Sequence, residues 1–192
     1  MRENRGFDFA AWAHVLWLHS QLRCATTLYL LNDNVIGPVS QAAFHTAIDR
    51  VPATPGDLVR MTEIYDRGWH IRGYFFVLGG HALRSELWSK FVQRIESLGD
   101  KDVVIDAYEV QLASEMAAAG LRTSLVSNTN FHSDPTIFHW RELLEDGFPF
   151  LKINTIPDEI PGVDKSGWRL VLRSRRFDLS IAHDVLAAIT AS

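Results

Sequence analysis

Three consecutive polar residues near the start of the sequence could hold a metal ion. Asp33 lies between Asn32 and Asn34, directly after the apolar run at residues 27–31. Carboxylate and amide oxygens suit a hard cation such as Mg²⁺, which takes one or two carboxylates and completes its shell with phosphate and water. The same residues also favour a turn, because Asn and Asp side chains bond the nearby backbone and the Gly-Pro pair that follows interrupts regular structure. Locally, the turn is the favoured interpretation.

A second acidic residue could act on protons. Glu109 lies near the middle of a helical pattern over residues 101–119, beside its apolar face. A half-buried carboxyl group at that position would have a raised pKa, as a general base requires. The alternative is a solvated glutamate on a helix surface, which is the usual situation of a helical glutamate.

The residues before the first expected helix form a third candidate cluster. Gly6 precedes that helix, Arg5 adds a positive charge, and Asp8 is a plausible N-cap. Backbone N–H groups at a helix N-terminus bind anions, and an arginine strengthens such a site. An N-cap carboxylate at Asp8 would compete for the same N–H groups, so a plain helix cap is the favoured alternative.

Two groups of histidines could contribute to a site. His70 opens an expected strand, while His132 and His139 follow the strand expected at residues 121–126. Either of the latter two could be a metal ligand, although a lone histidine more often is not. Their spacings match no zinc signature, and the sequence contains no phosphate-binding loop, dinucleotide fingerprint or nucleophile elbow.

The composition is that of an ordinary globular chain. It has 192 residues, 47% hydrophobic and 22% charged, which suggests one domain, residues 1–192, with a small appendage. A net charge of −4 gives no electrostatic case for nucleic acid, and the single Cys24 forms no intrachain disulfide. No apolar run approaches the ~20 residues of a membrane span, and the N-terminus lacks a signal-peptide core. We expect a cytoplasmic protein, with peripheral contact to the inner membrane left open.

Alternating strands and helices must position these residues. This alternation predicts an α/β fold with a mostly parallel or mixed sheet flanked by helices. Ligands in such folds bind beyond the carboxyl ends of strands, which is where Asp33 lies. The patterns predict helices at 8–22, 41–50, 82–98, 101–119, 138–145 and 180–188, and strands at 27–31, 58–64, 69–78 and 121–126.

Five ordered motifs resemble a known family. They are NRGFDFAAW, LYLLNDNVIGPV, HIRGYFFVL, VVIDAYEVQLASEMAAAGL and DPTIFHWRELLEDGFPFLK. Together they resemble the rhamnan synthesis protein F family of bacterial polysaccharide and lipopolysaccharide biosynthesis, over about residues 4 to 173.

The resemblance implies a GT-A-like glycosyltransferase that transfers a sugar such as rhamnose from a nucleotide sugar, dTDP-rhamnose or a relative, to a glycan acceptor. On that basis Asp33 takes the place of the metal-binding acidic motif for Mg²⁺ or Mn²⁺, with His132 as a second candidate ligand. Glu109 takes the place of the catalytic base. The residues expected around the donor and the cleft, with Trp140 as a sugar-stacking platform, are Arg5, Gly6, Asp8, Asn32, Asn34, His70, Tyr74 and Trp140.

Several positions depart from the family pattern. Asn34, Arg72-Gly73, Gln111 and Asp134 replace the usual Ser, Gln-Ser, Gly and Asn. The motifs also begin almost at residue 4, so we expect a partial, N-terminally short GT-A-like domain, with residues 157–192 as a C-terminal helical extension. A partner chain or a homo-oligomer could complete the sheet. Two alternatives remain open. The first is a non-catalytic remnant or module that binds a glycan or a partner transferase. The second is a metal-dependent hydrolase of nucleotide sugars.

Overall fold

The computed structural model describes residues 6–65, 70–71, 73–126, 133–153, 156 and 160–190. Contacts within the chain divide it into two compact units. Unit 1 comprises Met1–Asn32 and Val51–His132, and unit 2 comprises Asp33–Arg50 and Ser133–Ser192. The division falls after Asn32, so the three polar residues at 32–34 belong to different units.

Unit 1 is built on a four-stranded mixed sheet. The central strand β6 runs antiparallel to both of its neighbours, and β3 and β7 pair in parallel. The predicted α/β class with a mixed sheet is therefore confirmed. In spatial order the strands are β1 (Thr27–Leu31), β6 (Phe75–Gly79), β3 (Leu58–Arg60) and β7 (Thr123–Leu125), and a separate antiparallel pair joins β4 (Glu63–Ile64) to β5 (His70–Ile71).

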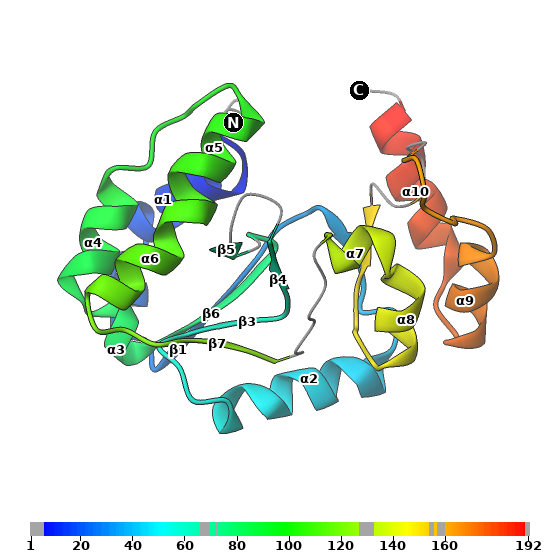
Figure 1. Cartoon of the computed structure of the whole chain (residues 1–192), viewed down its shortest axis with the longest axis horizontal. Helices are drawn as coiled ribbons and strands as arrows, with labels where there is room; N and C mark the ends of the chain where they lie inside the picture. Colours follow the sequence, from blue (N-terminus) through cyan, green and yellow to red (C-terminus); the bar gives the residue numbers. More distant parts are fainter. Residues whose placement is uncertain are drawn as a thin grey trace. The chain divides into compact units, whose positions relative to one another are not determined.

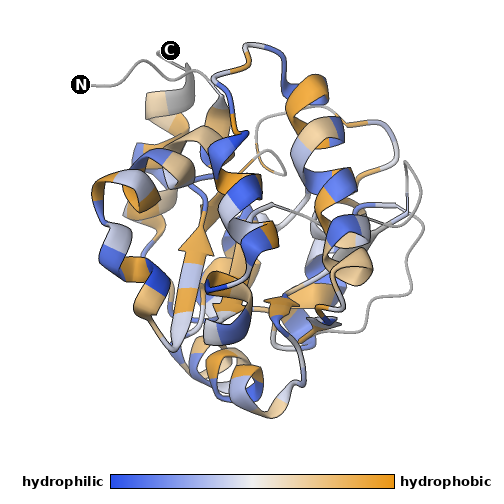
Figure 2. Cartoon of the chain, turned by 90° about the vertical axis from the view of Figure 1, so that its left-hand side faces the viewer, coloured by the Kyte–Doolittle hydropathy of each residue, from blue (hydrophilic) through white to orange (hydrophobic). Residues whose placement is uncertain are grey.

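Helices cover one face of this sheet. In Figure 1, α1, α4 and α6 lie together on that face, and their buried side chains Phe9, Phe91 and Leu112 join Phe76 of β6 in one core. Blue and orange alternate along the helices of Figure 2, as expected where one side of a helix is buried. The helical segments of unit 1 are α1 (Phe7–Leu18), η1 (Ser20–Cys24), α3 (Gly80–Leu83), α4 (Glu86–Gln93), α5 (Lys101–Val104), η2 (Ile105–Val110) and α6 (Gln111–Ala118).

Unit 2 is mainly helical. It has one short antiparallel pair, β2 (Val35–Ile36) with β8 (Leu151–Lys152), and its own core around Trp140, Leu144 and Trp168. Its helices are α7 (Pro135–Phe138), α8 (Trp140–Glu145), α9 (Trp168–Ser174) and α10 (Leu179–Thr190), together with most of α2 (Gln41–Ala53), within which the division between the units falls.

Local sequence signals located several elements correctly. The strand at 27–31 has the predicted bounds, and Ser40 caps α2 by accepting the Ala43 N–H at 3.2 Å. The predicted helix at 82–98 is instead two helices, because the Ser85 side chain caps a new helix by accepting the Trp88 N–H at 3.1 Å. Helix α9 lies within the predicted C-terminal helical extension, but its bounds were not predicted.

The first helix differs from its prediction. Gly6, at φ +78°, is the N-cap of α1, so the prediction that Asp8 caps this helix is wrong. Asp8 lies in the first turn instead, and α1 ends at Leu18 rather than at residue 22. Within the described part of the chain, no helix combines the length and apolar character needed to cross a bilayer.

Candidate functional site

A chain of hydrogen bonds connects three predicted site residues in unit 1. The Asn32 side chain, just beyond the end of β1, donates to Asp8 Oδ2 at 3.1 Å. The Asn32 backbone N–H donates to the Tyr74 carbonyl at 3.1 Å. The Tyr74 side chain is 4% exposed and its hydroxyl lies 2.8 Å from the Thr62 hydroxyl, so the ring does not line a cleft as predicted. The end of β1, the start of α1 and the residues before β6 are therefore fixed together.

Glu109 lies against the same segment at Gly73. A Cβ atom built on Gly73 would lie 2.6 Å from Glu109 Oε1 and 3.1 Å from the Phe9 ring. The carboxylate therefore occupies space that only a glycine at position 73 leaves open. Because Gly73 precedes Tyr74, this contact places Glu109 beside the backbone that the Asp8–Asn32 pair holds.

An unusual helical segment presents Glu109. Residues Ile105–Val110 form a π-helix between α5 and α6, where an ordinary helix was predicted. Val104, Tyr108, Leu112 and Met116 are all buried. Side chains spaced four residues apart drift around an α-helix, because it has 3.6 residues per turn. The wider turn of the π-helix offsets this drift and keeps the four side chains on the buried face. Tyr108 is thus anchored in the core, 5.5 Å from the Phe9 ring, which fixes the backbone of its neighbour Glu109.

The cluster can therefore combine proton transfer with polar recognition. Asp8, Asn32, Tyr74 and Glu109 come from four separate segments of unit 1, and the contacts above bring them together. A carboxylate held by packing is suited to accept a proton from a hydroxyl group. A carboxylate–amide pair is suited to bind the hydroxyl groups of a polar substrate.

The predicted metal-binding residues provide only part of a coordination shell. Asp33 is exposed and begins unit 2, where the Asn34 carbonyl accepts the Ile153 N–H at 2.9 Å. The described residues contain no group of three or more His, Cys, Asp or Glu side chains suited to a metal ion. One carboxylate fits a divalent cation only if phosphate and water supply the other ligands. The metal role of Asp33 stays a prediction on those terms.

Not all predicted site residues lie in the described part of the chain. Arg5 and His132 lie outside the described residues, and His70 is described only as backbone in β5. Gly6 is described, and its N–H donates to the Leu98 carbonyl at 2.8 Å. A Cβ atom there would lie 2.8 Å from the Ser97 Cα, so Gly6 lets the start of α1 approach the chain at Ser97 closely.

Trp140 does not fit its expected role. It is 4% exposed in the core of unit 2, and its indole N–H donates to the Asp164 carbonyl at 3.0 Å. Because Ile36, Leu144 and Leu151 belong to the same cluster, the ring is not available as a sugar-stacking platform. Trp140 instead forms part of the core of unit 2.

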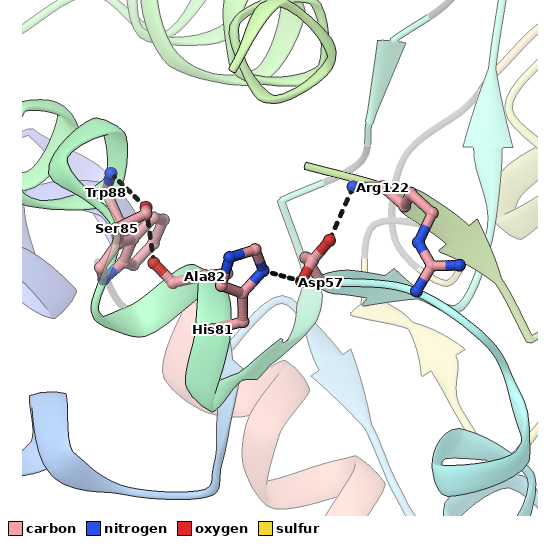
Figure 3. A network of polar contacts seen from close by, with 6 residues as sticks. All are labelled: Asp57, His81, Ala82, Ser85, Trp88 and Arg122. Carbon is pink, nitrogen blue, oxygen red and sulfur yellow. Dashed lines mark hydrogen bonds and ion pairs between the residues drawn. The ribbon is translucent and has the colours of Figure 1, made fainter. Parts of the chain in front are cut away.

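A second polar network fixes the opposite end of the sheet (Figure 3). Asp57 precedes β3, lies 2.7 Å from His81 Nδ1, and accepts the Arg122 backbone N–H at 2.9 Å. Burial acts to raise the pKa of Asp57, but the Arg122 N–H and the His81 ring outweigh it and hold the pKa below its usual value. This carboxylate ties together the chain segments before β3 and β7 and the start of α3.

Gly73, Thr62 and Phe9 were not identified as parts of the site from the sequence. Each acts through a long-range contact, and neither composition nor periodicity predicts such contacts. The one available signal was Gly73, because a glycine inside an expected strand often marks a close backbone approach.

Comparisons with known proteins give one result. The model of a family described as rhamnan synthesis protein F matches residues 1–167 of the 192. No curated protein and no solved structure matched the sequence significantly.

Proposed function

The chain belongs to the rhamnan synthesis protein F family, and on that premise we propose that it is a glycosyltransferase of bacterial surface-polysaccharide synthesis. The proposed reaction moves a sugar such as rhamnose from a nucleotide sugar, dTDP-rhamnose or a close relative, to a hydroxyl group of a glycan. We propose a GT-A-like arrangement for the fold.

The observation that carries this proposal is the position of Glu109. Its carboxylate is presented by a π-helix against Gly73, next to the Tyr74 backbone that bonds Asn32. In the proposed reaction the acceptor oxygen forms a bond to C1 of the donor sugar, and its proton passes to Glu109. The bond between C1 and the diphosphate oxygen breaks, and its electron pair leaves with the nucleoside diphosphate.

The remaining residues are assigned to binding. Asp8 and Asn32 would bind hydroxyl groups of the sugar. Asp33 would help to hold Mg²⁺ or Mn²⁺ together with the donor diphosphate. Such a cation would neutralise the charge that develops on the leaving group.

Product analysis tests the proposal. The full chain would be incubated with dTDP-rhamnose, Mn²⁺ and a rhamnan oligosaccharide, and the products identified by mass spectrometry. An oligosaccharide lengthened by one rhamnose is the expected product. Free rhamnose that depends on the protein would instead indicate a hydrolase, and an unchanged donor would indicate a non-catalytic member of the pathway.

A further inference from the structure

A groove lies between α1 and α4 in unit 1. It has a volume of about 380 Å³, within the range of small-ligand sites. Its lining includes Ala13, His14 and Trp17 of α1, Arg23 of η1, Gln93 of α4 and Ser97 beyond it. The groove therefore combines aromatic and hydrogen-bonding side chains.

Trp17 is the most unusual of these residues. Its side chain is 74% exposed, although indole rings bury large apolar areas in most proteins. The His14 ring, one helical turn away, stacks on it at 6.2 Å between centroids and 26° between planes. The two rings form a nearly parallel aromatic platform at the edge of the groove.

Polar side chains also line the groove. Arg23 Nη1 donates to Ser89 Oγ at 3.4 Å, and Gln93 Nε2 donates to the same oxygen at 3.3 Å. These contacts use one of five guanidinium N–H groups and one of two amide N–H groups, so further donors remain for a ligand. Among the described residues that line the groove, Arg23 carries the only permanent charge.

The groove is separate from the Glu109 cluster. Ala10, Ala13, His14 and Trp17 follow the spacing of one helix face, whereas Phe9 and Leu16 mark the face of α1 that packs on the core. Asp8, which bonds Asn32, lies on the side of α1 opposite the groove by the same spacing. A ligand in the groove would therefore not compete for Glu109.

We infer that this groove binds a sugar residue of a glycan, with the Trp17–His14 platform under the apolar face of the ring and Arg23 and Gln93 bonding its hydroxyl groups. A sugar ring has one such apolar face and a hydroxylated rim, which is the chemistry the groove offers. The inference rests on the proposed function, in which the acceptor is a glycan. The groove would hold a part of the acceptor remote from the bond that forms.

Calorimetric titration of the full chain with a rhamnan oligosaccharide tests this inference. We expect binding that weakens about tenfold or more in Trp17→Ala, as for truncation of a tryptophan anchor. Trp17→Phe should retain most of the affinity, and Gln93→Ala should weaken it several-fold. Tyr29→Ala removes another exposed aromatic side chain of unit 1 and should change nothing.

Two parallel titrations make failure interpretable. Equal affinities of wild type and Trp17→Ala, or no oligosaccharide binding at all, would overturn the inference. Vesicles of phosphatidylglycerol that bind through Trp17 while the oligosaccharide does not would overturn it too. Titration with dTDP-rhamnose separates the two proposals. Donor binding without glycan binding would overturn the groove inference and leave the proposed function standing. Trp17-dependent glycan binding without donor binding would support only the groove inference.

Discussion

The Glu109 carboxylate lies so close to the backbone of Gly73 that a single added methyl group would stand 2.6 Å from its Oε1 atom. Gly73 leads directly into Tyr74, whose carbonyl accepts the Asn32 N–H. The proposed base and the proposed binding residues are therefore coupled through two consecutive residues of the chain.

Gly73→Ala should impair transfer more than stability. The new Cβ atom would displace the end of the Glu109 side chain, and a misplacement of about 1 Å can cost about 10²-fold in rate. Donor affinity should stay unchanged. Steady-state assays with thermal melts check this, and Gly99→Ala is the matched control because nothing lies within 4 Å of the Cβ atom added there. Equal rates in the two variants would contradict the coupling.

Glu109→Gln should bind donor normally and lose turnover. The amide keeps the shape of the side chain but cannot take the acceptor proton. Loss of a general base lowers the rate by about 10²–10⁴-fold. Glu115→Gln on α6 is the control, because Glu115 pairs with Arg94 at the surface and takes no part in the proposed chemistry. Turnover of Glu109→Gln within a few-fold of wild type would remove Glu109 from the mechanism.

Asp57 should make stability depend on pH. The Arg122 N–H and the His81 ring hold its folded-state pKa below the usual value of an aspartate. Its stabilising effect is therefore fully present above the unfolded pKa and is lost as the pH falls through the folded pKa. Asp57→Asn should destabilise the protein by about 1–2 kcal/mol at neutral pH, mainly by weakening the bond to Arg122 N–H.

Thermal melts between about pH 3 and pH 7 check this linkage. The difference in melting temperature between wild type and Asp57→Asn should shrink at the acid end. The melting temperature of the exposed Asp49→Asn should follow that of wild type throughout. A difference that stays constant over the whole range would show that the Asp57 charge does not contribute.

Lys152→Met should destabilise unit 2. Asp134 is 4% exposed, and Lys152 Nζ lies 3.0 Å from its Oδ2 atom. Removing one partner of a buried pair leaves an uncompensated charge, at a cost of about 3–5 kcal/mol. Denaturant unfolding measures the loss, which the double variant Lys152→Met/Asp134→Asn should partly reverse.

Lys90→Met is the control for this pair. Lys90 and Glu86 form an exposed ion pair at 2.7 Å, and such pairs add little to stability because solvent screens both charges. Similar losses for Lys90→Met and Lys152→Met would show that burial of the Asp134–Lys152 pair has no special weight.

Local signals allowed the sequence to predict part of this fold. The apolar run at 27–31, the Ser40 cap and the helix end before Gly120 each depend on a few neighbouring residues, and all three are confirmed. Helix α1 was harder, because Val15, Trp17 and Leu18 are exposed although apolar. A helix that is apolar on all sides gives no periodic signal for its buried face.

The site could be predicted only in pieces. Glu109, Asp8 and Asn32 were identified, but not their proximity, since Asp8 and Asn32 are 24 residues apart in the chain. The π segment follows from packing of Tyr108 and Leu112 against the core, which a helical pattern does not reveal. Trp140 was assigned to the cleft because aromatic residues serve both cores and sugar sites, and its position is in the core.

Donor binding tests whether Asp33 and a divalent cation hold the nucleotide sugar. Calorimetry of the full chain with dTDP-rhamnose, with and without Mn²⁺, would be run on wild type, Asp33→Ala and the exposed control Asp49→Ala. We expect Mn²⁺-dependent binding by wild type and Asp49→Ala that is lost in Asp33→Ala. A folded wild-type protein that binds no dTDP-, UDP- or GDP-sugar, or an Asp33→Ala variant that binds as wild type does, would contradict this expectation.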